Sequence, residues 1–231
     1  MKILGPYLSD IAGIYLVGSY ARNEETKNSD IDILVITNKT NKRIKQEKYE
    51  LILISKDKVE IILKKSALPL LPMLKEAKSI LNERLIESYK NAHLTKLNLE
   101  MSLNMIKSAL NVNRSFIDLS KEDKSNCSNA VAYSLILNLR SVYIIECLIK
   151  NTKWTNKELQ KTIKKITGSL EAYNGYLRIK NDENSENKLD IEEAEKLYAY
   201  ILNKLKKEER WLTKKDRKSN RKFRETKSIA Y

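Results

Sequence analysis

The sequence predicts an α+β protein in which an N-terminal mixed sheet with helices is followed by an all-helical bundle. Three short apolar runs that read as strands fall within the first 55 residues, and no strand-like alternation continues after about residue 90. Glycine and proline number only five and three, and 32% of residues are charged, a mix that favours helices over a turn-rich all-β fold. The predicted domains are residues 1–90, a helical domain over 91–212 and a basic tail over 213–231.

The sheet of the first domain is predicted from three segments, IAGIYLV (11–17), SDIDILVIT (29–37) and YELILIS (49–55). Polar residues separate them, and we expect a loop at ARNEETKN and a charged connection at NKTNKRIKQEK. Ser55 is expected to cap a helix through KDKVEIILKK. Two prolines then break the pattern, and a helix or a short strand is expected through residues 73–85.

Helical spacing replaces the strand pattern from about residue 90. It is carried first by Leu94, Leu97, Met101, Met105 and Leu110. The more apolar segment 129–150 is expected to be the central helix of a bundle. Capping boxes at Thr155 and Asp190 begin two further helices, the last ending near Trp211.

The formal net charge of the chain is +14, and the tail is its most basic part. Residues 213–231 carry eight basic and two acidic side chains. Such a tail can contact nucleic-acid phosphates, or it can be a solvated, disordered end, and the sequence leaves both readings open.

Cysteine and histidine are too few for a zinc site. The two cysteines and the single histidine show no CxxC or HxxxH spacing. Two cysteines within mostly helical sequence indicate reduced, buried thiols in a cytoplasmic protein. We expect no membrane span, because the most apolar run, 134–149, is interrupted by Arg140 and Glu146.

The segment GSYARNEETKNSDIDIL, residues 18–34, carries the chemistry. Side chains alternate along a strand with a rise of ~3.3 Å per residue, so Asp30 and Asp32 share one face, roughly 7 Å apart. Burying unpaired carboxylates costs several kcal/mol, which a metal ion would offset. A third carboxylate from a neighbouring strand would complete a Mg²⁺ site; Glu50 is the best candidate, and Glu60, on the helix that follows, is the rival.

A phosphate-binding turn is predicted at the end of the first strand. Glycine at position 18 lets backbone N–H groups approach a phosphate closely, and the Ser19 hydroxyl can bond a phosphate oxygen. Arg22 adds charge, and Ser29 can cap the strand or contact phosphate. A triphosphate bridged by a metal to the aspartates would be held at both ends, as metal-assisted nucleotidyl transfer requires.

The segment 17–35 resembles the signature of the nucleotidyltransferase superfamily; it reads VGSYARNEETKNSDIDILV. The fold of this superfamily includes the DNA polymerase β palm and kanamycin nucleotidyltransferase. Within the superfamily, the segment resembles the minimal nucleotidyltransferase branch most closely. The resemblance is strong over 14–37 and extends in layout over about 1–90. It implies that Gly18 and Ser19 bind phosphate and that Asp30 and Asp32 bind metal. The third acid of the family falls at Glu50, where the family more often has aspartate. The rival reading makes both aspartates surface acids of an edge strand.

The helical half resembles, in placement, the bundle of kanamycin nucleotidyltransferase and the HEPN-type partners of minimal nucleotidyltransferases. HEPN ribonucleases carry an arginine followed four to six residues later by histidine. Arg140 has no such histidine, and no arginine precedes His93 at that spacing, so we expect substrate binding or dimerisation rather than ribonuclease activity. AYNGYLRIK, at 172–180, is a further candidate for an acceptor-binding edge.

The sequence therefore predicts a Mg²⁺-dependent nucleotidyltransferase, with Mn²⁺ as the alternative ion, that transfers AMP from ATP to an acceptor hydroxyl and releases pyrophosphate. The acceptor stays open between a small molecule, RNA and a protein, the last as in antitoxin-like protein adenylyltransferases. A non-catalytic nucleotide- or RNA-binding protein is the rival function. We expect no membrane partner, and a homodimer is the commonest form of assembly.

Overall fold

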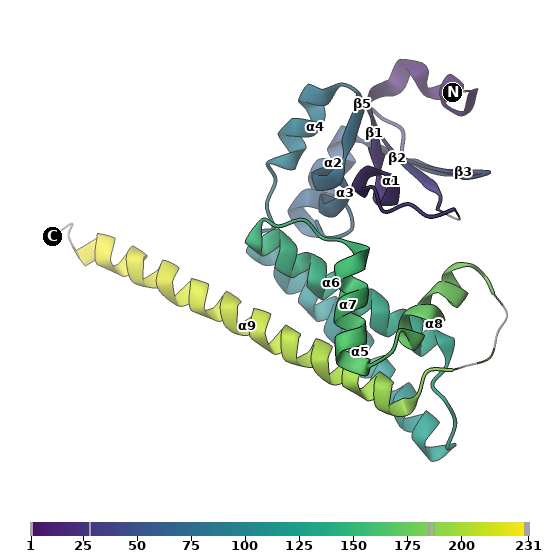
Figure 1. Ribbon diagram of the computed structural model, residues 1–231. Coiled ribbons are helices and arrows are strands. Elements are labelled where there is room, and N and C mark those ends of the chain that lie inside the picture. Colours follow the sequence, from purple (N-terminus) through teal and green to yellow (C-terminus); the bar gives the residue numbers. More distant parts are fainter. Residues whose placement is uncertain (1, 28, 184–185, 187, 229–231) are drawn as a thin grey trace. The chain divides into compact units, whose positions relative to one another are not determined.

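The computed structural model describes residues 2–27, 29–183, 186 and 188–228, with side chains for residues 3–27, 29–183, 186 and 188–209. The chain divides into two compact units (Figure 1). The first unit comprises residues 1–101 with 147–156, and the second comprises residues 102–146 with 157–231.

The first unit contains one five-stranded mixed sheet. Its strands pair in the order β3 (Lys42–Gln46), β4 (Tyr49–Ser55), β2 (Ile31–Thr37), β1 (Ile11–Val17) and β5 (Lys78–Leu81). β2 and β4 run parallel, and every other neighbouring pair is antiparallel. The three predicted strands are confirmed as β1, β2 and β4.

The prediction of a charged connection between β2 and β4 was wrong for residues 42–46, which form β3. Lys42, Arg43 and Lys45 are exposed there, and Ile44 is half-buried. The strand forms because its backbone pairs with β4 at the edge of the sheet, where charged side chains remain in water. Because β3 is mostly polar, it lacks the apolar run from which the other strands were predicted.

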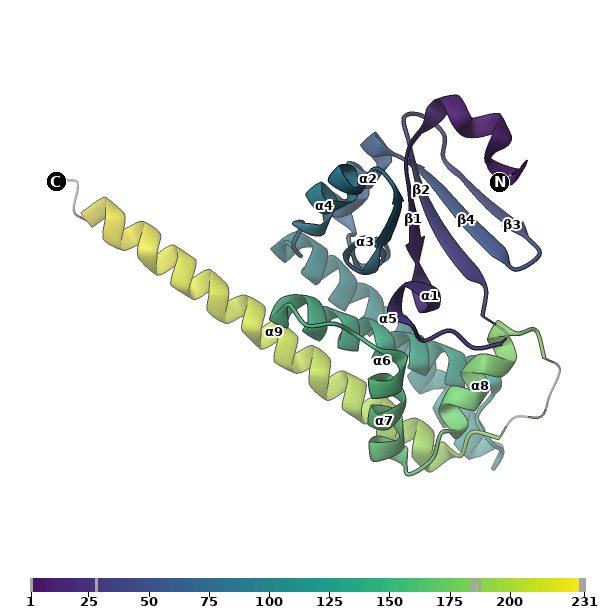
Figure 2. The ribbon, with the colours of Figure 1, turned by 45° about the horizontal axis from the view of Figure 1, so that its top comes forward.

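Helices cover both faces of the sheet. They are η1 (Lys2–Asp10), α1 (Gly18–Arg22), α2 (Lys56–Lys65), α3 (Leu71–Glu76) and α4 (Glu83–Lys90). α2, α3 and α4 pack on one face, in a core that includes Val59, Leu74 and Ile86, whereas Leu4 of η1 packs on the other (Figure 2). Burial on both faces explains why the central strands read as continuous apolar runs rather than alternating ones.

The structure tests two local predictions in this unit, the Ser55 cap and the segment 73–85. Ser55 caps α2, because its hydroxyl accepts a hydrogen bond from the Lys58 backbone N–H at 3.3 Å. The segment 73–85, expected to be a helix or a short strand, contains the end of α3, all of β5 and the start of α4.

The second unit is helical, which confirms the predicted order of a sheet followed by a helical region. Its segments come from α5 (Lys96–Glu122), α6 (Asn129–Lys150), α7 (Asn156–Thr167), α8 (Glu171–Lys180) and α9 (Ile191–Ser228). α9 continues well past Trp211, where we expected it to end, because no glycine or proline follows to stop it. The side chains of the basic tail lie outside the described residues.

α6 is the most apolar helix and lies at the centre of this unit. Its buried side chains include Leu135, Ile136, Leu139 and Ile145. Among the described residues it is the one helix whose length and composition would also suit a membrane span, and half of its most apolar 18-residue window is buried inside the protein. The core helix of a globular protein can have the same length and composition.

Candidate active site

The predicted turn and the aspartates meet at one end of the β1–β2 pair. β1 ends at Val17, and Val17 pairs with Asp32 across the antiparallel ladder. Asp30 directly precedes β2, and both aspartates are half-buried. The topology thus brings together residues that lie twelve or more positions apart in the sequence.

Gly18 lies directly against the carboxylate of Asp32. Its φ of +72° is in the left-handed region, and a Cβ added there would lie 2.1 Å from Asp32 Oδ2. A side chain at this position would meet both backbone strain and a clash with the carboxylate. The glycine therefore lets the Asp32 carboxylate pack against the backbone of the turn.

Glu50 stands beside Asp32 in the sheet. The parallel ladder pairs Asp32 with Glu50, and residues paired in this way present their side chains to the same face. Arg43 of β3 donates to the Glu50 carboxylate, with Nε 2.7 Å from Oε1 and a second contact from Nη2. The rival acid, Glu60, lies on α2 as expected, and its side chain is exposed.

Asp30 also lies near a cation of β3, with Lys45 Nζ 3.8 Å from Asp30 Oδ2. Among the described residues, no three Asp, Glu, His or Cys side chains converge closely enough to hold a metal by themselves. Mg²⁺ usually keeps several waters and is bound by one or two carboxylates together with substrate phosphates. The pair Asp30 and Asp32 fits an ion that arrives with a nucleotide.

Arg22 is held inside the unit. Its Nη1 lies 2.7 Å from Glu76 Oε2 and its Nε 2.9 Å from Glu24 Oε2. The guanidinium carbon lies 3.8 Å from the centre of the Trp154 ring, and 10% of the Arg22 side chain is exposed. The charge that we expected to face a phosphate is thus balanced by two carboxylates and stacked on an indole.

Glu76 is a residue of this site that the sequence did not predict. It ends α3, 58 positions after Gly18, and its Oε1 accepts a hydrogen bond from the Gly18 backbone N–H at 2.7 Å. One carboxylate therefore holds both ends of α1, through the Gly18 N–H and the Arg22 guanidinium. We call Gly18, Arg22 and Glu76 the turn clamp.

The two predicted serines differ in their surroundings. Ser19 is half-buried in the first turn of α1. Ser29 accepts a hydrogen bond from the Thr26 backbone N–H at 2.8 Å, and the two hydroxyls lie 3.1 Å apart. Ser29 thus shapes the loop that leads into Asp30.

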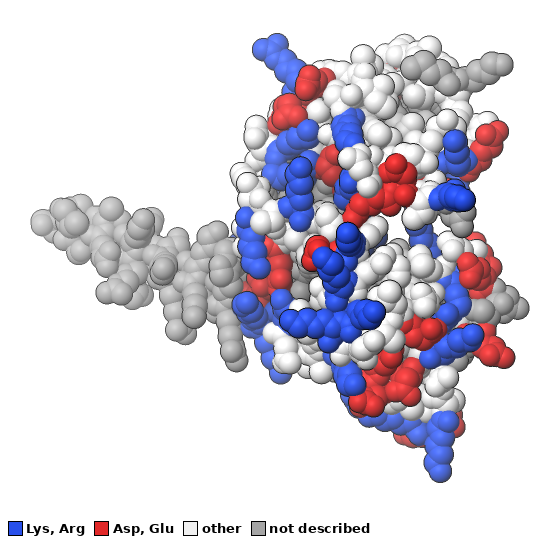
Figure 3. Space-filling model, in the orientation of Figure 1, with Lys and Arg blue, Asp and Glu red and all other residues white. Residues whose placement is uncertain are grey.

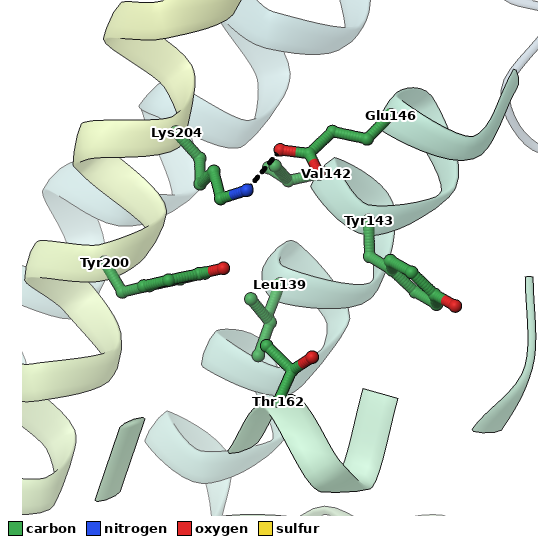
Figure 4. Close-up of a pocket in the computed structure, with 7 residues that line it drawn as sticks. All are labelled: Leu139, Val142, Tyr143, Glu146, Thr162, Tyr200 and Lys204. Carbon is green, nitrogen blue, oxygen red and sulfur yellow. Dashed lines mark hydrogen bonds and ion pairs between the residues drawn. The ribbon is translucent and has the colours of Figure 1, made fainter. Parts of the chain in front are cut away.

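A small pocket lies within the second unit, between α6, α7 and α9 (Figure 4). Its polar centre is the pair of Lys204 and Glu146, with Nζ 2.5 Å from Oε1. Burial alone would lower the pKa of Lys204, but the hydrogen bond and charge of Glu146 outweigh it and raise that pKa above its ordinary value. The two charged groups satisfy each other, so the pocket itself indicates no ligand.

AYNGYLRIK forms most of α8 and packs into the helical unit. Tyr176 stacks on Tyr133 with ring centres 5.4 Å apart, and Arg178 bonds Asn129 and Glu171. A Cβ at Gly175 would lie 2.7 Å from Ala132 Cβ, which shows how closely α8 and α6 approach. These contacts give the segment a structural role.

One face of the molecule can be examined for charge in Figure 3. On the face shown in Figure 3, Lys and Arg side chains are interspersed with Asp and Glu side chains. This face gives no direct support to a nucleic-acid acceptor, whose phosphates favour clustered basic side chains.

Residues 2–87 match the family model described as nucleotidyltransferase domain. No curated protein matches the chain. A nucleotidyltransferase-like protein from Exiguobacterium sibiricum 255-15 is 15% identical, with a TM-score of 0.39, over 89% of this chain and 73% of that one. Spectinomycin adenyltransferase AAD(9) from Enterococcus faecialis, solved with ATP and spectinomycin, is 15% identical, with a TM-score of 0.43, over 89% of this chain and 96% of that one. The motif, the mixed sheet and the family match agree in indicating a nucleotidyltransferase-type domain over residues 2–87.

Proposed function

We propose that the protein is a Mg²⁺-dependent nucleotidyltransferase that transfers AMP from ATP to an acceptor hydroxyl. The observation that carries this proposal is the packing of the Asp32 carboxylate against the Gly18 turn, with Asp30 two residues before it, inside a domain of this family. The acceptor oxygen would bond to the α-phosphorus, the bond from that phosphorus to the bridging oxygen would break, and pyrophosphate would leave.

Each site residue has a distinct proposed role. Asp30 and Asp32 would hold Mg²⁺, which supplies charge stabilisation for the triphosphate and the leaving pyrophosphate. Glu50 is paired with Asp32 in the sheet and would accept the proton of the acceptor hydroxyl once it exchanges its contacts with Arg43. Gly18 and Ser19 would contact the triphosphate.

For Arg22 and Ser29 we propose positioning roles in place of the predicted phosphate contacts. Arg22 acts with Glu76 on the shape of the turn rather than directly on phosphate, because both of its polar edges meet carboxylates. Ser29 acts on the loop before Asp30 through its bond with Thr26. Both are positioning residues in this proposal.

The test measures nucleotide binding and pyrophosphate release separately. The purified chain is titrated by calorimetry with each nucleoside triphosphate and Mg²⁺, and then assayed with hydroxyl acceptors of three classes: small polyols and aminoglycosides, RNA 3′ ends, and proteins. We expect Asp32→Asn to bind little nucleotide and to release no pyrophosphate. Glu60→Gln removes an exposed acid from the same domain and is expected to change neither.

Two outcomes would reject the proposal. Unchanged turnover in Asp32→Asn would remove the aspartate from the reaction. Mg²⁺-dependent nucleotide binding with no transfer to any acceptor class would favour the rival function, a non-catalytic nucleotide-binding protein.

A further inference from the structure

Helix α5 has two apolar faces within the second unit, and only one of them is buried. Leu103, Ile106, Leu110 and Ile117 are at most 4% exposed. The second set is Met105, Val112, Phe116 and Leu119, with 66, 55, 52 and 51% of each residue exposed. We call this second set the outer α5 face.

The outer α5 face is narrow and continuous. At about 100° of rotation per residue, its four side chains fall within an arc of about 60°, roughly 140° around the helix from the buried set. A surface helix of a globular protein normally has one apolar stripe, facing its own core. A second one points to a partner that this unit does not supply.

The charges of α5 lie on a different side of the helix. Lys107 Nζ lies 3.6 Å from Oε1 of Glu209 on α9, and Arg114 Nη1 lies 3.3 Å from Oε1 of Glu195 on the same helix. By the same helical geometry, the residues of the second unit that flank the four apolar ones on this face are all uncharged: Ser102, Ser108, Ala109, Ser115 and Ser120. In a chain with 32% charged residues, a partner can cover this stretch without burying a charge.

We propose that the outer α5 face is a dimer interface, in which α5 of one copy packs antiparallel against α5 of a second copy. A two-fold interface must be self-complementary. An axis passing by Val112 satisfies this requirement, because it sets Met105 opposite Leu119 of the partner and Leu119 opposite Met105 of the partner. The same axis sets Phe116 opposite the small Ser108 of the partner, so that large and small side chains interdigitate.

The area suits a stable dimer. A large apolar side chain that is half exposed offers about 100 Å², so the four contribute about 400 Å² per copy and about 800 Å² in the pair. Homodimer interfaces are about 65% apolar, which implies about 1,200 Å² in total. Specific interfaces bury about 1,200–2,000 Å².

Net charge also favours an uncharged contact between copies. Each chain carries +14, so two copies repel one another through most of their surfaces. Meeting at the outer α5 face keeps the basic side chains apart and in water. The proposal does not depend on nucleotidyl transfer and stands or fails separately from it.

The first test measures the mass of the full chain by light scattering over a concentration series. We expect twice the chain mass of 26.9 kDa. Met105→Glu and Phe116→Glu each place two carboxylates in the interface and are expected to weaken dimerisation at least about 100-fold. Ile61→Glu, at a residue 47% exposed on α2, is the matched control and is expected to leave the dimer intact.

A second test does not need a disruptive variant. Val112→Cys places two thiols beside the proposed axis, and we expect oxidation to yield a disulfide-linked dimer, whereas Ile61→Cys yields none. The two native cysteines are buried and are shared by both variants. A monomer at every concentration, a dimer that survives both Glu substitutions, or equal crosslinking of the two Cys variants would overturn the proposal.

Discussion

Replacing Gly18 with alanine tests the contact on which the candidate active site is built. The φ of this residue is +72°, and the left-handed region costs an L-residue about 1–2 kcal/mol. The added Cβ would lie 2.1 Å from Asp32 Oδ2, whereas ordinary contacts begin near 3.4 Å. The carboxylate must therefore move by about 1 Å or more, and displacements of that size at a reacting centre can cost about 100-fold in rate.

We expect Gly18→Ala to lower kcat/KM about 100-fold while it lowers the free energy of unfolding by only about 1–3 kcal/mol. Pyrophosphate release gives the first quantity, and denaturant unfolding gives the second. Calorimetry with Mg²⁺ and ATP shows independently whether the displaced carboxylate weakens binding.

Gly168→Ala is the matched control. Gly168 also has a positive φ, of +88°, but nothing lies within 4 Å of a Cβ added there. It should show the same backbone strain, about 1–2 kcal/mol, with no loss of activity. The reasoning is refuted if Gly18→Ala binds and turns over nucleotide like the wild type, or if Gly168→Ala loses as much activity.

Two further substitutions probe the same unit. Glu76→Ala leaves the nearly buried Arg22 with one of its two carboxylates and the Gly18 N–H without its acceptor. The free energy of unfolding, measured with denaturant, should therefore fall by about 2–4 kcal/mol. A fall of less than ~1 kcal/mol would contradict this role of Glu76. Tyr15 is fully buried and donates to the Asn82 carbonyl at 2.9 Å, and burial raises its pKa from 10.0 to about 12. As the pH rises, the phenol ionises first in the unfolded chain. The contribution of Tyr15 to the free energy of unfolding is therefore fully present below pH 10 and should fall by about 1 kcal/mol per pH unit up to about pH 12. Tyr15→Phe should remove this contribution, and an equal slope in both proteins would show that it comes from elsewhere.

The sequence predicted the parts of the fold in which composition and geometry agree. β1, β2 and β4 were predictable because both of their faces are buried, and α2 because Ser55 precedes an amphipathic segment. β3 was not predictable in this way, because the pairing of its backbone with β4, rather than its side chains, holds it in place.

The candidate site was predictable only where its residues are close in sequence or on paired strands. Gly18, Asp30 and Asp32 belong to one motif, and Glu50 follows from the alternation of side chains on a neighbouring strand. Glu76 carries no such signal, because its partners are set by where α3 ends in space. The orientation of the Arg22 side chain was equally unpredictable, because it depends on the contact with Glu76.

The turn clamp also has a consequence for how relatives of this protein can vary. Arg22 is paired with a carboxylate that comes from 54 positions later in the chain, and the same carboxylate binds the backbone of Gly18. A lone change at position 22 leaves the nearly buried Glu76 carboxylate without its guanidinium, and a lone change at position 76 leaves Arg22 with Glu24 alone. In an alignment of homologues, these two positions should therefore vary together, and their covariation would report a contact that neither position reveals by itself.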